Sequence, residues 1–445
     1  MPVYVTESEL QPVLPLEGSF ASKFIDFAGK LGDSPLAYHY VNALGLLAAV
    51  SPHNLMIEDI VGGTHYANFW GMVVGRPGVE HKTSALKIAT GVLNAVAPQR
   101  VGSVIGSYEG IVRMLAPPNS TRLAPLFEMG HFLNASAGTG YQDKIKPFLT
   151  DIYDCQPYDR PLSNKPMRIP NPRLSILAAV NHDLLQTHAT PSDWGGGFMS
   201  RWFVLNSITE RDDPEEGPTK TEAAELRSHL LGLMNDPVGR CGGLTVEGNA
   251  FWRAWNRQMK KKMEEALTGA QASIHGRIGL HAVKIALLLA FDYGTARTKD
   301  EWFLDEDLLW IGTQLADMHH RCMKDLAQAA QPTNFMRERF QVLQVVEGAL
   351  QRQDPYMSFA EILRSTSMGK RRLAEVLDSL LTEETTITFE MRGGAQWFAM
   401  HAAQLPEAVP DNVVNLHEMM SPEMNRLMAA AQGREIDFED AGEEG

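Results

Sequence analysis

The chain has 445 residues, of which 44% are hydrophobic and 21% charged, a composition that excludes a disordered or fibrous protein. This length suits about two or three domains. The formal charge is −14, but the last 45 residues hold ten acidic residues against two arginines, so the total does not exclude nucleic-acid binding elsewhere.

Cysteine usage and apolar patterning exclude two further classes of protein. Cys155, Cys241 and Cys322 lie far apart without a CxxC pair, which excludes a disulfide framework or a zinc knuckle. The longest uninterrupted apolar stretches fall far short of the ~20 residues of a membrane span, and residues 1–18 carry no secretion signal. We therefore expect no membrane partner and a cytoplasmic location.

The first half of the chain has the pattern of an α/β fold. Helical periodicity covers residues 20–31 and 35–50, and the apolar run FWGMVV at residues 69–74 predicts a buried strand. A turn rich in Gly and Pro and a helical pattern at residues 83–96 follow, which is the start of a βαβ unit. Further apolar runs predict parallel neighbours of this strand, with helical segments such as residues 144–153 between them. These runs are residues 124–127, 174–180 and 201–205.

The second half is predominantly helical. A charged, Pro-containing segment at residues 211–220 predicts a linker or surface loop, and residues 330–334 form a second break. Helices are predicted at residues 222–235, 246–267, 273–291 and 306–328. The whole pattern predicts five regions: an N-terminal helical region (1–55), an α/β core (56–210), a helical lid or bundle (211–334), a compact module (335–400) and a largely disordered acidic tail (401–445).

The segment GRPGVEHKTSAL, which begins at Gly75, is a candidate phosphate loop. Glycines let the backbone curl so that its amides point at phosphates, while Lys82 supplies an ammonium and the Thr83 hydroxyl a Mg²⁺ ligand. The lysine lies seven residues after Gly75 instead of six, and the alternative is a turn before a surface helix. The predicted nucleotide-binding residues are Gly75, Gly78, His81, Lys82, Thr83 and Ser84.

Four further residues complete a candidate ATPase site. Glu128 follows a predicted strand and could activate water, although Phe127 stands where the Asp of the usual Asp-Glu pair would hold the metal. Asn181 ends the next predicted strand, where it could contact the γ-phosphate as a sensor. The alternative is that it caps the following helix. Arg201 follows a Gly-rich turn as a candidate arginine finger acting on a neighbouring subunit, or as a surface residue. Arg277 begins an apolar helix as a candidate second sensor.

The order of these motifs resembles an uncharacterised family of prophage- and mobile-element-encoded P-loop ATPases, related in layout to hexameric AAA+ helicases. The matching segments lie between about residues 20 and 300: residues 66–86, residues 127–133, Tyr141 with Lys146, Leu149, Tyr153 and Asp154, and the segments 169–179 and 197–202. His81 and Phe127 depart from the family pattern, and Phe127 puts hydrolysis in question. The resemblance implies ATP and Mg²⁺ as cofactors, a homo-oligomer such as a hexamer, replication proteins as partners, and the bacterial host cytoplasm.

The module at residues 335–400 has the pattern of a winged helix. Residues 336–352 have helical period, Ser358 and Glu361 form a capping box, and two strands around Gly393-Gly394 form a hairpin. The second helix of the turn starts at a basic run, which opposes the helix dipole and favours a phosphate partner. A winged helix used for protein contacts is the alternative. The predicted DNA-binding residues are Lys370, Arg371, Arg372 and Arg392.

These motifs predict an ATP-dependent DNA helicase or helicase-like motor of phage or mobile-element replication. The first alternative is a replication initiator or loader that binds ATP as a switch with little hydrolysis, which Phe127 favours. The second is a packaging or structural phage protein that keeps only the fold and binds no nucleotide.

Overall fold

The chain folds into two compact units, Met1–Ala330 and Gln331–Met419. The computed structural model describes residues 3–58, 63–102, 107–117, 120–136, 144–160, 167–209, 214–236, 240–264, 269–294, 301–329, 334–347, 349, 354, 356–366, 368–382, 387–392 and 395–400. The predicted acidic tail, Tyr141, the turn at Gly393-Gly394, part of the predicted linker (211–213) and most of the predicted second break (330–333) lie outside the described residues.

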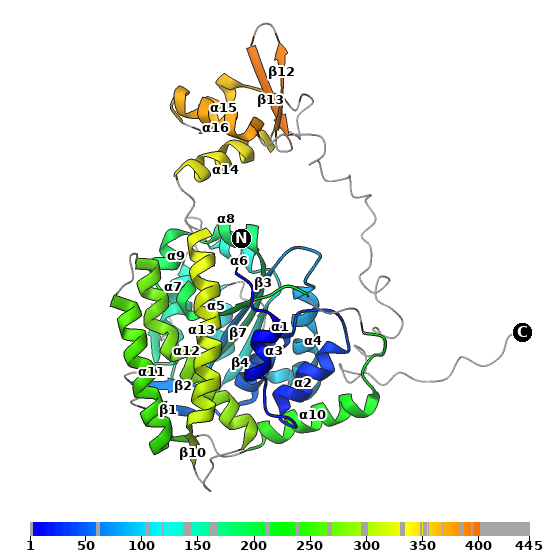
Figure 1. The fold of residues 1–445 in the computed structure, drawn as a ribbon, viewed down its shortest axis with the longest axis vertical. Coiled ribbons are helices and arrows are strands. Elements are labelled where there is room, and N and C mark those ends of the chain that lie inside the picture. The colour runs from blue at the N-terminus through cyan, green and yellow to red at the C-terminus, as the bar shows by residue number, and fades with distance from the viewer. Residues whose placement is uncertain are drawn as a thin grey trace, which may run out of the picture. The chain divides into compact units, whose positions relative to one another are not determined.

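A four-stranded parallel sheet lies at the centre of the first unit, in the order β4-β7-β3-β8. Figure 1 labels its strands β4, β7 and β3 among the surrounding helices. Its strands are β4 (Thr121–Leu126), β7 (Arg173–Asn181), β3 (Trp70–Gly75) and β8 (Phe203–Asn206). Nearly every residue of these strands is buried, because helices cover both faces. The predicted α/β class with a central parallel sheet is therefore confirmed.

Helices surround this sheet, and α3 lies closest to it. Every residue of α3 except Leu36 is buried, and the helix packs against all four strands. At Gly45 an added Cβ would lie 2.7 Å from the Leu177 side chain, so a glycine is needed for α3 to approach β7 this closely.

The helices of the unit are α1 (Glu7–Leu10), α2 (Phe20–Gly29), α3 (Leu36–Val50), α4 (Lys82–Val96), α5 (Tyr108–Leu115), α6 (Met129–Ala135), α7 (Ile145–Ile152), α8 (His182–His188), α9 (Pro191–Gly195), α10 (Lys220–Met234), α11 (Val246–Glu264), α12 (Gly269–Tyr293) and α13 (Glu306–Ala329), with 3₁₀ turns η1 (Gln11–Val13), η2 (Pro98–Arg100) and η4 (Met199–Arg201).

Two smaller sheets were not predicted from the sequence. A mixed sheet in the order β10-β9-β1-β2 joins strands from the predicted core and the predicted helical lid. A short hairpin pairs β5 with β6. Their strands are β1 (Met56–Glu58), β2 (Thr64–Tyr66), β9 (Arg240–Leu244), β10 (Glu301–Leu304), β5 (Tyr158–Arg160) and β6 (Met167–Ile169).

Helix α12, the longest among the described residues, is a core helix of the first unit. Its stretch Ala272–Tyr293 is long and apolar enough to cross a membrane by length and composition, which the sequence reading had not recognised. Of the most apolar part of this stretch, 78% lies buried inside the folded unit. The helix packs against α13, α11, α3 and α9, as Figure 1 shows for its neighbours α11 and α13.

In the described part of the second unit, three α-helices accompany a three-stranded antiparallel sheet in the order β11-β13-β12. Leu373, Val376, Leu377 and Leu380 of α16 lie in the hydrophobic core of this unit. The predicted capping box is present, since the Ser358 and Glu361 side chains each accept a hydrogen bond from the other's backbone N–H. Its elements are α14 (Asn334–Glu347), β11 (Met357–Ser358), α15 (Phe359–Thr366), α16 (Lys370–Thr382), β12 (Ile387–Arg392) and β13 (Ala395–Met400).

Candidate functional site

Three adjacent strands of the central sheet end beside one another and carry the predicted polar residues. The last residue of β3, Gly75, pairs in register with Asn181, the last residue of β7. Glu128 lies two residues beyond the end of β4, which is the neighbour of β7 on its other side. Because all three strands are parallel, their carboxyl ends meet at one edge, which is where open α/β sheets bind ligands.

A cavity of about 240 Å³ opens at this edge, and we refer to it as the Lys82 cavity. It brings together residues from the loop after β3, from the first turn of α4, from the segment after β4 and from the end of β7. The predicted residues that line it are Gly78, His81, Lys82, Thr83, Ser84, Glu128 and Asn181, together with Phe127. Of the predicted nucleotide-binding residues, Gly75 lies beneath the loop, outside this lining.

The loop between β3 and α4 has two residues in left-handed conformations. These are Gly78, with φ of 70°, and His81, with φ of 44°. His81 is the N-cap of α4 but makes no side-chain capping hydrogen bond, and its imidazole lies 3.5 Å from the Asp33 carboxylate. The first-turn amides of α4 therefore lack a side-chain cap beside the cavity, at the helix end that favours an anion.

The Lys82 side chain reaches the loop from the first turn of α4. The residue is 7% exposed, and its Nζ donates a hydrogen bond to the Arg76 carbonyl oxygen at 2.7 Å. Burial lowers the pKa of the Lys82 ammonium, while the carboxylates of Glu80 and Glu128 favour its charged form. Because its hydrogen bond goes to a neutral carbonyl oxygen, a phosphate entering the cavity would bring an anion into direct contact with this buried ammonium.

The Glu80 carboxylate accepts hydrogen bonds from the loop between β3 and α4, a role that the sequence analysis did not predict. It is completely buried and accepts hydrogen bonds from the Arg76 backbone N–H at 2.5 Å and from Arg76 Nε at 2.7 Å. The Tyr38 hydroxyl lies beside it and contacts the carbonyl oxygens of Val74 and Ser207 at 2.6 and 3.0 Å. These contacts fix the curl of the loop.

Gly75→Ala tests this close packing. The added Cβ would overlap the Tyr38 hydroxyl oxygen and lie 3.1 Å from Glu80 Oε2. We expect the free energy of unfolding to fall by about 1–3 kcal/mol, because overpacking displaces buried hydrogen-bonded groups. Chemical denaturation measures the change. Gly232→Ala in α10, where a Cβ meets nothing within 4 Å, is the control and is expected to raise stability by up to about 1 kcal/mol. Equal stability of the Gly75 variant and the parent would contradict this account.

The surroundings of Asn181 bear on its two predicted roles, γ-phosphate sensor and helix cap. It is the N-cap residue of α8, yet its side chain makes no capping hydrogen bond. The side chain lines the Lys82 cavity instead. This arrangement favours the ligand-facing role over the helix cap.

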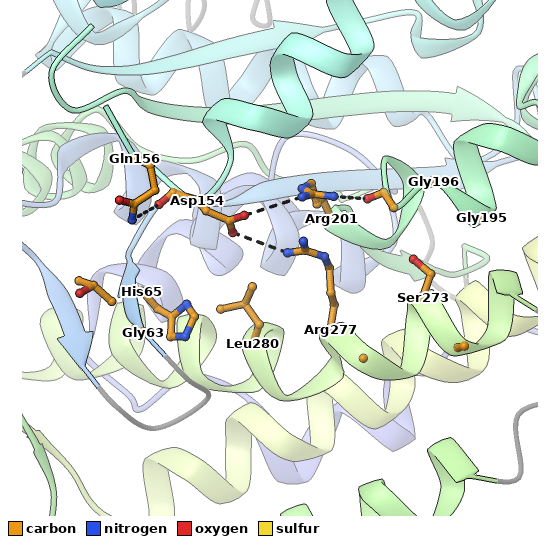
Figure 2. A pocket seen from close by; sticks show the side chains of 14 residues that line it. Gly63, His65, Asp154, Gln156, Gly195, Gly196, Arg201, Ser273, Arg277 and Leu280 are labelled. Carbon is orange, nitrogen blue, oxygen red and sulfur yellow. Dashed lines mark hydrogen bonds and ion pairs between the residues drawn. The ribbon is translucent and has the colours of Figure 1, made fainter. Parts of the chain in front are cut away.

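Arg201 and Arg277 line a different cavity of about 680 Å³, which we call the arginine cavity (Figure 2). Arg201 Nη2 and Arg277 Nη1 each lie 3.7 Å from a carboxylate oxygen of Asp154, which follows α7. Burial lowers the pKa of Arg201, and Arg277 lowers it further. Neither arginine lines the Lys82 cavity, so the structure does not bring them to the predicted phosphate loop of their own chain.

The four predicted DNA-binding residues of the second unit, Lys370, Arg371, Arg372 and Arg392, differ in their surroundings. Lys370 and Arg371 are exposed at the start of α16; the Arg371 side chain is 95% exposed and lies 3.4 Å from the Glu375 carboxylate. Arg372 is paired with Glu338 at 2.5 Å and Glu375 at 3.0 Å. Arg392 is paired with Asp354 and Glu390. The most accessible basic surface of this set is therefore the first turn of α16.

Comparisons with known proteins leave the chain without an assigned family. No protein-family model matches it. No curated protein matches it either. The functional argument therefore depends on the geometry of these sites.

Proposed function

We propose that this chain is an ATPase that acts on DNA as a helicase or helicase-like motor of phage or mobile-element replication. The observation that supports it is the Lys82 cavity, where the loop after β3 meets Glu128 and Asn181 from the ends of two neighbouring strands. A phosphate loop, an acidic residue and a polar sensor are the parts that nucleotide hydrolysis needs in one place. These motifs also follow one another along the chain in the order found in the mobile-element P-loop ATPases that the sequence resembles.

In this proposal the loop residues bind the triphosphate. Backbone amides of the loop residues that line the cavity, such as Gly78 and His81, and the ammonium of Lys82 would contact phosphate oxygens, whereas the Arg76 N–H already donates to Glu80. The Thr83 hydroxyl, the phosphates and water would hold Mg²⁺, which prefers oxygen ligands. Bound Mg²⁺ would neutralise charge on the phosphates. Glu128 orients and deprotonates the attacking water, and Asn181 contacts the γ-phosphate.

Arg201 would complete the site of a neighbouring subunit, which makes a ring-shaped homo-oligomer, such as a hexamer, part of the proposal. Arg201 lines a different cavity from the Lys82 cavity of its own chain, which is consistent with action on another copy. A guanidinium there matches the charge that develops on the transferred phosphoryl group.

The second unit is proposed to be a winged helix that contacts DNA. Its three helices and antiparallel sheet have the expected order, and α16 would place Lys370 and Arg371 against the phosphate backbone. Arg372 and Arg392 are less exposed than Arg371 and lie closer to their carboxylate partners, which leaves these two arginines a smaller role in that contact.

The switch-like initiator or loader remains the second candidate because of Phe127. Its ring lines the Lys82 cavity where the Asp of the usual pair would contribute a metal ligand. With Thr83 and water left to hold the metal, nucleotide binding without rapid turnover is the outcome this candidate predicts.

The two candidates differ in DNA-stimulated hydrolysis. For the motor, phosphate release from ATP is expected to rise at least about tenfold when single-stranded DNA is added. Tight ATP binding without stimulated release would support the switch. The absence of any nucleotide affinity would contradict both and leave the packaging or structural phage protein.

The Lys370→Ala/Arg371→Ala double variant extends this test to the second unit. We expect its affinity for DNA to fall about tenfold at low salt, because two phosphate contacts are removed. Basal hydrolysis should not change, since both residues lie in the other unit from the Lys82 cavity. Fluorescence anisotropy with labelled DNA measures the loss, and Arg364→Ala, an exposed arginine on α15, is the matched control. Equal losses in the two variants would argue against a role for the start of α16.

A further inference from the structure

The arginine cavity has features of an anion site within a single chain. Arg201 is 8% exposed, and among the described residues its buried Nε has no hydrogen-bond partner. Its Nη1 donates to the Gly197 carbonyl oxygen at 2.7 Å. A buried guanidinium with an unpartnered N–H requires an explanation, because such a group loses its hydration without compensation.

One face of α12 positions both arginines. Ser273, Arg277 and His281 are spaced four residues apart and so share a face of the helix. Ser273 Oγ donates to Ser200 Oγ at 3.0 Å, and His281 Nε2 lies 2.9 Å from the Ser200 carbonyl oxygen. The turn that carries Arg201 is therefore attached to α12 on both sides of Arg277. This attachment fixes the two guanidinium groups beside the same cavity, as Figure 2 shows.

Positive charge exceeds negative charge around this cavity. Asp154 is the only carboxylate among the described residues that line it, and it faces two guanidinium groups. Both ion pairs are 3.7 Å long, well beyond the 2.7–2.9 Å typical of a charge-assisted hydrogen bond. The Tyr153 ring behind them lies 5.5 Å from each guanidinium and 4.4 Å from the Lys284 ammonium. Asp154, whose side chain is 45% exposed, thus only partly neutralises this cluster.

We propose that the arginine cavity binds a phosphate group between Arg201 and Arg277, and that Asp154 is the counter-ion that this phosphate displaces. A phosphate offers several oxygens to two planar guanidinium groups, which the single carboxylate at 3.7 Å does not match. The cavity volume lies within the ~300–1,000 Å³ of small-molecule sites. The phosphate is carried either by a free nucleotide or polyphosphate, or by a nucleotide bound to a second copy of this chain. Only the second source depends on the proposed ATPase function.

Calorimetric titration with inorganic tripolyphosphate tests the cavity alone. The full chain carrying Lys82→Ala is used as the parent, so that the proposed phosphate loop does not contribute. We expect about one tripolyphosphate to bind per chain, with affinity reduced at least about tenfold by Arg277→Ala and raised several-fold by Asp154→Asn. Arg168→Ala, which removes an arginine whose side chain is 71% exposed, should leave the affinity unchanged.

Equal affinity of the Arg277→Ala variant and its parent would overturn the proposal, and so would the absence of binding. Loss of single-stranded DNA binding in Arg277→Ala with unchanged tripolyphosphate binding would also overturn it, in favour of a DNA contact. These outcomes do not depend on whether the chain hydrolyses ATP.

Mixing two inactive variants distinguishes the two sources of phosphate. Lys82→Ala chains keep the arginine cavity, and Arg277→Ala chains keep the Lys82 cavity. Hydrolysis by the mixture above the sum of the separate variants supports a nucleotide held by a second copy. Tripolyphosphate binding without such recovery supports a free nucleotide or polyphosphate as the ligand.

Discussion

Replacing Lys82 by alanine is expected to weaken ATP binding at least about 100-fold, which corresponds to about 2.7 kcal/mol. The Lys82 ammonium is buried at the rim of the cavity, and its hydrogen-bond acceptor is a neutral backbone carbonyl. A triphosphate would exchange this neutral acceptor for a full negative charge in a site of reduced dielectric, where charge-assisted contacts are strongest. Titration calorimetry with Mg²⁺ and ATP measures the loss directly.

Lys87→Ala is the matched control for this experiment. Lys87 lies on the same helix, five residues further on, and so faces away from the Lys82 cavity, which it does not line. Its replacement removes the same charge from α4 and should leave ATP affinity within about twofold. If Lys82→Ala binds ATP as tightly as the parent, the Lys82 cavity is not a phosphate site, and both the motor and the switch are rejected.

The central sheet could be predicted from the sequence because its strands are continuous apolar runs. The segments of β3 and β7 read WGMVVG and RLSILAAVN, and both are almost entirely buried. The mixed sheet could not be predicted in the same way. β1 has three residues and β9 reads RCGGL, so neither is long or apolar enough to stand out from a loop. Pairing between β1 and β9, which are far apart in the sequence, is decided by the tertiary fold.

The Lys82 cavity could be anticipated for a related reason. Parallel strands end at one edge, so residues placed just after their ends were expected to meet, as Lys82, Glu128 and Asn181 do. Glu80 gave no such signal, because a glutamate in a Gly- and Pro-containing loop is ordinarily expected in water. Its burial depends on Tyr38 and on the missing side chain of Gly75, which only the packed structure reveals.

The arginine cavity shows where sequence reasoning ends. Arg201 and Arg277 were recognised one at a time, each from the glycines or the helix beside it. Their convergence on Asp154 requires α12 to lie along the turn after α9, through contacts between segments far apart in the chain. A local pattern contains no information on such contacts.

Replacing Glu128 by glutamine is expected to reduce ATP hydrolysis at least about 100-fold while leaving ATP affinity within about threefold. Glutamine keeps the size of the side chain but cannot accept the proton of the attacking water, and loss of a general base typically costs 10²–10⁴ in rate. Glu128 is the one carboxylate among the described residues that line the Lys82 cavity, since Phe127 occupies the neighbouring position. No second acid at this cavity is therefore available to take over its role.

The same variant decides between the two candidate functions. For a motor, the parent hydrolyses ATP at a measurable rate that DNA stimulates, and Glu128→Gln removes this turnover. The control Glu225→Gln replaces an exposed carboxylate on α10 and leaves the turnover unchanged. For a switch, the parent already turns over slowly, because Phe127 supplies no metal ligand, and Glu128→Gln changes the rate little. Single-turnover phosphate release with each variant measures the chemical step separately from product release. Rapid hydrolysis by Glu128→Gln would show that another group activates the water, and the assignment of Glu128 as the base would then be wrong.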